Sequence, residues 1–369
     1  MMRVSVIVFV WLTAAHAATI GADSDRGAEL FGSLSCVQCH SMNGKGGMIG
    51  PDLGRRIDRN FTPASLAATM WNHAPTMWTS MRERNIEIGD LNDQAAADLF
   101  AYFYSTRFFE KPGDAARGKR LFSAKHCAEC HGLTETKLPE AKPVAQWESL
   151  GHPVVLVNAM WNHGVTMRQQ FARRRLAWPE LTSQDLTDLL VYLRNLPSTR
   201  NRPIRFAITS GANGHALVTS KGCANCHTGN LELPPLLKNK TLTDIAVAMW
   251  NHEPMMAPVP AGLDVEEMRE IVSYLWAQQF FEDSGQVAAG ARVFTSKHCA
   301  TCHNDASSAA PKLIGTGRSI NATAMVAALW HHGPRMLELM KGRGVAWPRF
   351  DAQEMSNLIA YLNSRDRGK

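Results

Sequence analysis

The chain has 369 residues, of which 45% are hydrophobic and 20% are charged, and its formal net charge is +6. This length suggests two or three folded domains. The positive charge is only a weak indication of nucleic-acid binding, and no nucleic-acid-binding motif is present, so we expect no nucleic-acid partner.

The first 17 residues have the pattern of a secretory signal peptide. Arg3 supplies a positive charge, residues 4–14 form a short apolar run, and Ala15-His16-Ala17 resembles a cleavage site. A retained N-terminal anchor is the alternative, although the run is short for a membrane span. No later segment reaches the roughly 18 apolar residues of a spanning helix. We therefore expect an exported protein, periplasmic or otherwise outside the cytoplasm, that is soluble after signal cleavage.

A five-residue motif, Cys-x-x-Cys-His, occurs four times and uses all eight cysteines. It is the attachment signature of a c-type haem, in which two thiols bond to the porphyrin and the His binds the iron from one side. The attachment residues would be Cys36, Cys39, Cys127, Cys130, Cys223, Cys226, Cys299 and Cys302, and the proximal ligands His40, His131, His227 and His303. Four disulfides or two Cys₄ zinc sites are alternatives, but neither explains a His after every pair.

Each motif lies in a longer repeat with the same elements in the same order. A Gly stands nine residues before the first Cys in a predicted helix, and a Tyr stands in another predicted helix at the end of the repeat. The glycines are Gly27, Gly118, Gly214 and Gly290, and the tyrosines are Tyr102, Tyr192, Tyr274 and Tyr361. We expect the Gly to let the first helix cross closely over the last one.

A third shared element lies between these two helices. It is a short helical run that ends in Met-Trp-Asn-His at residues 70–73, 160–163 and 249–252, and in Leu-Trp-His-His at residues 329–332. In the first copy, Thr62 and Pro63 predict the start of a helix. A Met follows six residues after the Trp in every copy.

The repeats predict an all-α fold with four tandem domains. Their expected bounds are 18–110, 111–198, 199–282 and 283–369, after the signal peptide at 1–17. Residues 102–127 and 274–299 align without a gap at an offset of 172, which indicates that repeats 3 and 4 duplicate repeats 1 and 2. Residues 195–211 contain several Pro and Arg residues and read as a linker, so we expect the contact between repeats 2 and 3 to differ from the others.

Each repeat resembles a class I cytochrome c domain, and the resemblance covers essentially the whole mature chain. It implies a small all-α fold around one haem, and electron transfer as the activity. It also implies a distal methionine as the sixth iron ligand, which would be Met77, Met167, Met256 and Met336. The alternative is the histidine that each repeat carries after its Trp, namely His73, His163, His252 and His332.

The resemblance further implies that a backbone carbonyl, usually at a proline, accepts a hydrogen bond from each proximal His. Pro51, Pro311 and Pro235 are the expected residues in repeats 1, 4 and 3, and either Pro139 or Pro143 in repeat 2.

We therefore expect a c-type cytochrome with four covalently bound haem c groups that carries electrons between other redox proteins and is not an enzyme. One alternative is a haem enzyme such as a multihaem peroxidase, which needs an iron with an open distal site. Repeat 3 is then the one to suspect, because its Met-to-Tyr spacing is 18 residues against 25 elsewhere. Another alternative is the cytochrome subunit of a dehydrogenase complex.

Overall fold

The part of the chain that can be placed is almost entirely helical. The computed structural model describes residues 21–54, 62–87, 89–106, 113–202, 207–237, 240–256, 262–280, 285–305, 308, 310–316 and 319–364. Within them the only strands are β1 (Ser41–Met42) and β2 (Lys45–Gly46), which form a small antiparallel hairpin. The expected all-α fold is confirmed for these residues, whereas the expected signal peptide at 1–17 lies outside them.

Every repeat has a first helix, a short turn, a long helix and a last helix. Repeat 1 has α1 (Ser24–Ser33), η1 (Cys36–Gln38), α2 (Pro63–Glu83) and α3 (Asp93–Ser105). Repeat 2 has α4 (Ala115–Ala124), α5 (Cys127–Cys130), η2 (Val144–Gln146), η3 (Glu148–Gly151), α6 (Pro153–Arg174) and α7 (Ser183–Arg194). Repeat 3 has α8 (Gly214–Ser220), η4 (Cys223–Asn225), η5 (Gly229–Leu231), α9 (Leu233–Leu236), α10 (Leu242–His252), η6 (Glu253–Met255) and α11 (Val265–Phe280). Repeat 4 has α12 (Val287–Ser296), α13 (Ala300–His303), α14 (Ala322–Gly342) and α15 (Ala352–Leu362).

The first and last helices of each repeat are in contact, as the sequence predicted: α1 with α3, α4 with α7, α8 with α11, and α12 with α15. A glycine lies at each crossing. A Cβ at Gly27 would overlap the carbonyl of Asp98 and the Cβ of Tyr102. The other three repeats show the same overlap at Gly118, Gly214 and Gly290 with the opposing helix and its Tyr. The crossing therefore needs a residue without a side chain.

The long helix extends further than the sequence predicted. α2 begins at Pro63, with Thr62 as its N-cap, but it continues through His73 to Glu83. α6 and α14 likewise run well past their motifs, whereas α10 ends at His252 and a short 3₁₀ turn follows. The histidine and the expected methionine of repeats 1, 2 and 4 therefore lie on one continuous helix.

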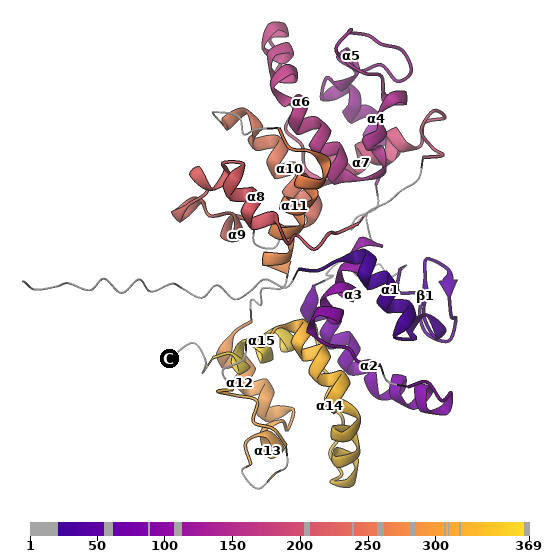
Figure 1. Ribbon diagram of the computed structural model, residues 1–369, viewed down its shortest axis with the longest axis vertical. Coiled ribbons are helices and arrows are strands. Elements are labelled where there is room, and N and C mark those ends of the chain that lie inside the picture. The colour runs from indigo at the N-terminus through magenta and orange to yellow at the C-terminus, as the bar shows by residue number, and fades with distance from the viewer. Residues whose placement is uncertain are drawn as a thin grey trace, which may run out of the picture.

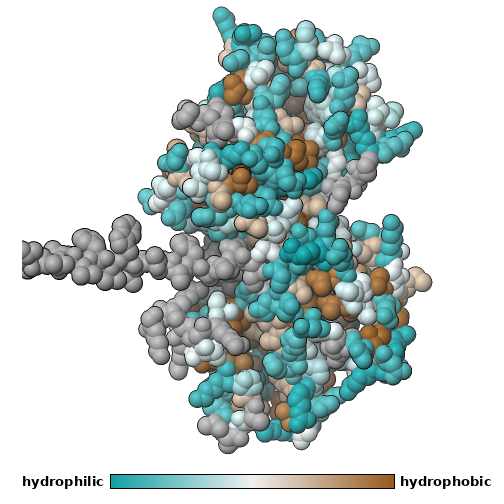
Figure 2. Space-filling model, in the orientation of Figure 1, coloured by the Kyte–Doolittle hydropathy of each residue, from teal (hydrophilic) through white to brown (hydrophobic). Residues whose placement is uncertain are grey.

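The repeats pack in two pairs, and Figure 1 shows these pairs as two lobes. In one lobe, α2 of repeat 1 packs against α14 and α15 of repeat 4. In the other, α6 of repeat 2 packs against α10 and α11 of repeat 3. The two large clusters of buried side chains follow this division, although a few residues of repeat 1 join the cluster of repeats 2 and 3. On the face shown in Figure 2, the lobes are mainly hydrophilic with small scattered apolar patches.

The contact between repeats 2 and 3 recurs between repeats 4 and 1. Trp250 of repeat 3 stacks on Trp178 of repeat 2, with ring centroids 4.2 Å apart. Trp71 of repeat 1 stacks in the same way on Trp347 of repeat 4, at 5.3 Å. The contact between repeats 2 and 3 therefore has an equivalent that joins repeats 4 and 1, which the sequence did not predict.

Candidate functional site

Each Cys-x-x-Cys-His motif forms one turn of backbone directly after the first helix of its repeat. The amide of the His donates to the carbonyl of the first Cys at 2.9–3.0 Å in all four copies. The residue before that Cys has a left-handed backbone in every repeat, with φ of 64° at Ser35, 63° at His126, 82° at Gly222 and 63° at His298. This conformation ends the first helix and turns the chain into the motif. The motif therefore occupies a single turn that begins directly after the helix.

The proximal histidine rings are all held by a backbone carbonyl through Nδ1. His40 donates to the carbonyl of Pro51 at 3.0 Å, and His303 to that of Pro311 at 2.8 Å, as expected. Since a carbonyl only accepts, the proton lies on Nδ1 and leaves the lone pair of Nε2 available to an iron.

The other two acceptors differ from the expected prolines. His131 donates to the carbonyl of Lys142, which directly precedes Pro143, at 3.1 Å. His227 donates to the carbonyl of Leu231 at 3.0 Å, within the 3₁₀ turn η5. Pro235 was the wrong choice because η5 closes the loop four residues after His227 and brings an earlier carbonyl to the ring.

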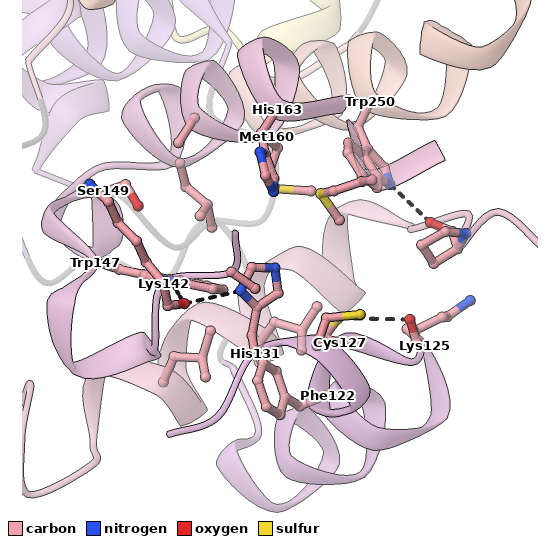
Figure 3. Close-up of a pocket in the computed structure, with 18 of the residues that line it drawn as sticks. Phe122, Lys125, Cys127, His131, Lys142, Trp147, Ser149, Met160, His163 and Trp250 are labelled. Carbon is pink, nitrogen blue, oxygen red and sulfur yellow. Dashed lines mark hydrogen bonds between the residues drawn. The ribbon is translucent and has the colours of Figure 1, made fainter. Parts of the chain in front are cut away.

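A partly open cavity of about 550 Å³ with a mostly apolar lining lies mainly in repeat 2. Figure 3 shows His131 and Cys127 on one side of it, with His163 and Met160 of α6 on the other. Trp147 packs edge-on against the His131 ring, with centroids 5.1 Å apart. Sites for organic cofactors commonly have volumes of about 300–1,000 Å³. The volume of the cavity, its apolar lining and the presence of Cys127, Cys130 and His131 in that lining therefore fit a covalently attached haem.

The cavity environment favours uncharged side chains. Burial raises the pKa of the thiols of Cys36, Cys127 and Cys299 to about 11, and it also raises the pKa of Cys223. Burial lowers the pKa of the His163 imidazole, and burial together with nearby His163 lowers that of His131. The first cysteine of each motif is therefore a neutral thiol at neutral pH. Both imidazoles of repeat 2 are in the neutral form that binds metals.

A second histidine faces the proximal ring in three repeats. The ring centroids are 6.2 Å apart for His40 and His73, 6.2 Å for His131 and His163, and 5.9 Å for His227 and His252. In repeat 4, where both rings are described, His303 and His332 form no such pair, and the side chain of His332 is exposed.

The expected distal methionines lie close to these histidines in the chain, but they do not occupy the position that faces the proximal ring. Met77 and Met167 follow His73 and His163 by one helical turn, and Met167 lines the cavity of repeat 2. Met256 follows η6, and Met336 lies on α14. Their role as iron ligands stays a prediction.

Sequence reasoning missed what the Trp and Asn of the third element do. The indole N–H of Trp71 donates to the carbonyl of Pro348 at 3.0 Å, and that of Trp250 to the carbonyl of Pro179 at 2.9 Å. These side chains therefore dock one repeat onto another. The sequence Ala-Trp-Pro recurs at residues 177–179 and 346–348, and this repeat could have indicated the surface that the Trp side chains contact.

The neighbouring asparagine extends each contact. The side-chain amide of Asn251 donates to the carbonyl of Leu181 at 2.8 Å and accepts from its amide at 2.9 Å. Asn72 makes the same two hydrogen bonds with Phe350, at 2.8 and 2.9 Å. Because each asparagine directly precedes the second histidine of its repeat, these hydrogen bonds hold that histidine at the contact between paired repeats.

Neither alternative for the cysteines gains support from the geometry. Across the described ranges, no three His, Cys, Asp or Glu side chains come together as a metal site requires. The eight thiols, all of which are described, form no disulfide.

Family models match repeats 1, 2 and 4. Residues 24–107 and 115–197 match the cytochrome c family. The first two repeats are cytochrome c domains. Residues 285–362 match the family of cytochrome c oxidase, cbb3-type, subunit III. Cytochrome c domains hold an iron-containing haem c covalently and transfer electrons, so the chain is a c-type cytochrome in these regions.

Searches of curated proteins and of solved structures found no match to the chain. Among the helices that the structure describes, none combines the length and the apolar character needed to cross a membrane.

Proposed function

We propose that the chain is an exported tetrahaem c-type cytochrome that passes electrons between redox proteins. The observation that carries this proposal is the fourfold recurrence of one local geometry. The His that ends each Cys-x-x-Cys-His turn donates its Nδ1–H to a backbone carbonyl. Repeat 3 has this geometry as fully as the repeats that match a family.

The proposed attachment residues are the eight cysteines Cys36, Cys39, Cys127, Cys130, Cys223, Cys226, Cys299 and Cys302. The proposed proximal ligands are His40, His131, His227 and His303. Bound haem supplies reversible one-electron chemistry at iron. The protein residues fix the haem, orient the imidazole and keep the lining apolar. The proposed domains are residues 18–110, 111–198, 199–282 and 283–369.

Haem counting tests this proposal. A pyridine haemochrome assay against protein mass is expected to give four haems per chain, and mass spectrometry is expected to give an N-terminus at Ala18. The double variant C223S/C226S should lose one haem and keep the other three. A wild-type count below four in fully matured protein would reject the tetrahaem proposal.

A haem enzyme is the second candidate, and one observation bears on where its catalytic iron would lie. Repeat 3 has His252 facing His227, which argues against an open site there despite its shorter loop. Repeat 4 lacks the facing ring and has an exposed His332. If the protein carries electrons only, reduced protein should bind carbon monoxide only slightly. Stoichiometric binding at haem 4 would favour the enzyme.

A further inference from the structure

In repeats 1, 2 and 3 a second imidazole stands where a sixth iron ligand would bind. Imidazole nitrogen binds first-row metals at about 2.0 Å, and the ring centre lies about 1.1 Å behind the nitrogen. Two imidazoles on opposite sides of one iron therefore have centroids about 6.2 Å apart. The observed separations are 6.2, 6.2 and 5.9 Å.

We propose that His73, His163 and His252, rather than Met77, Met167 and Met256, bind the irons of haems 1, 2 and 3. This inference rests on the proposed function, because it presupposes a haem in each repeat. It departs from the sixth ligand that the resemblance to class I cytochromes c implied.

The separation alone does not carry the argument, because packed aromatic rings also lie about 4.5–7 Å apart. In repeat 2, however, the two rings face each other across the 550 Å³ cavity, which both of them line. Figure 3 shows His131 and His163 on opposite sides of this cavity. The two rings therefore flank space of the size that a cofactor needs.

Helix geometry then separates the histidine from the methionine. Four residues of α-helix rise about 6 Å along the axis. His73 and Met77 are four residues apart on α2, and His163 and Met167 have the same spacing on α6. A helix that places the histidine opposite the proximal ring therefore places the methionine one turn further along. No loop lies between them that could bring the sulfur to the same point.

Repeat 4 provides a contrast within the same chain. It has the same residue types at the same spacing, His332 and Met336 on α14, but the His332 ring does not face His303. The neighbouring His331 lies 3.0 Å from Asp90 of repeat 1. The proposal therefore covers three haems, and Met336 stays the predicted ligand of haem 4.

The fully loaded protein tests the proposal by optical spectroscopy. Fe(III)–S(Met) coordination gives a weak long-wavelength charge-transfer band that bis-His haem lacks. We expect a band of about one quarter of the intensity of four Met-ligated haems, because only haem 4 keeps a methionine. A band of full intensity would overturn the proposal.

A pair of variants assigns the ligand of haem 2. His163→Ala should make about one haem in four bind carbon monoxide when reduced, or should add a charge-transfer band if Met167 moves in. Added imidazole should reverse the change. Met167→Ala should leave the band and the carbon monoxide binding as in wild type. If Met167→Ala lost part of the charge-transfer band while His163→Ala behaved as wild type, Met167 would be the ligand of haem 2 and the proposal would be overturned.

The haem count of each variant separates this inference from the proposed function. Four haems with a full-intensity band would reject the histidine ligands and leave the tetrahaem cytochrome intact. Fewer than four haems in the wild-type protein would reject the tetrahaem cytochrome itself. His332→Ala is the matched control, because its ring faces no proximal histidine, and it should not open a haem to carbon monoxide.

Discussion

Tyr104 and Trp276 occupy equivalent positions 172 residues apart, and their rings pack against each other with centroids separated by 4.9 Å. The hydroxyl of Tyr104 also accepts from the amide of Leu242 in repeat 3, at 3.2 Å. When equivalent residues of two copies touch each other, a two-fold axis relates the copies. The chain therefore behaves as an internal dimer of two halves, each consisting of two repeats.

This relationship explains the pairing of the repeats. A two-fold axis that exchanges the halves makes the contact of repeat 1 with repeat 4 equivalent to that of repeat 3 with repeat 2. The odd repeats supply Trp71 and Trp250, and the even repeats supply the stacking partners Trp347 and Trp178. Paired haems would thus lie on either side of a contact made by residues adjacent to the second histidines.

The asparagine contacts predict equal losses of stability in the two lobes. Asn72→Ala and Asn251→Ala each remove two hydrogen bonds to a buried residue, Phe350 or Leu181. Each change should lower the free energy of unfolding by about 1–3 kcal/mol, because backbone groups are left unpaired. Denaturant titration of the haem-loaded protein measures this. Exposed Asn201→Ala is the control, and clearly unequal losses in the two variants would argue against the two-fold arrangement.

The geometry of each Cys-x-x-Cys-His turn, the proximal half of each proposed haem site, could be predicted from sequence because it is local. The Cys-x-x-Cys-His turn lies within five residues, and the carbonyls that accept from His40 and His303 follow a short distance after it. The predicted acceptor was wrong in repeats 2 and 3, where the length of the loop, rather than the type of residue, determines which carbonyl reaches the histidine.

The pairing of the repeats could not be predicted, because it depends on contacts far apart in the chain, and the sequence left the distal ligand open between a methionine and a histidine. The hydrogen bond from Trp71 to Pro348 spans 277 residues, and nothing within repeat 1 indicates repeat 4 as its partner. The family pattern favoured Met77 over His73. Which of the two side chains can reach the iron depends on whether α2 continues through His73. The short helical run predicted from the sequence did not show that it does.

Two glycines of α1 should respond in opposite directions to alanine. Gly27→Ala would drive a Cβ into the carbonyl of Asp98 and the side chain of Tyr102, and should destabilise the fold by about 1–3 kcal/mol. At Gly32 no atom lies within 4 Å of the added Cβ, so alanine should stabilise by about 0.5–1 kcal/mol through helix propensity. Thermal unfolding compares the two. Equal effects would mean that the helix crossing is not tight.

His152 should make stability depend on pH between about 4 and 6.5. Its ring accepts from the amide of Val154 at the start of α6, and burial lowers its pKa to about 4. In this window the unfolded chain binds a proton that the folded chain does not, so stability falls as the pH is lowered. The loss should be about 3 kcal/mol across the window. His152→Asn keeps a capping side chain without the titration, and its unfolding free energy should change less over the same range.

Trp147 should tune the potential of haem 2 alone. Its indole N–H donates to the carbonyl of Lys142 at 2.9 Å, and the same carbonyl accepts from Nδ1 of His131 at 3.1 Å. Trp147→Phe keeps an aromatic ring at this position but removes the indole N–H that competes for the Lys142 carbonyl. That carbonyl then becomes a stronger acceptor for His131. A stronger hydrogen bond makes the imidazole more basic and favours Fe(III).

The expected result is a lower potential for about one quarter of the haem in a redox titration, with the other three haems unchanged as internal controls. Trp147→Leu removes the ring as well as the donor and should also broaden the transition of haem 2, since the edge-on contact that holds His131 is lost. A shift to higher potential in Trp147→Phe, or a shift spread over all four haems, would show that this hydrogen bond does not control the proximal ligand of repeat 2.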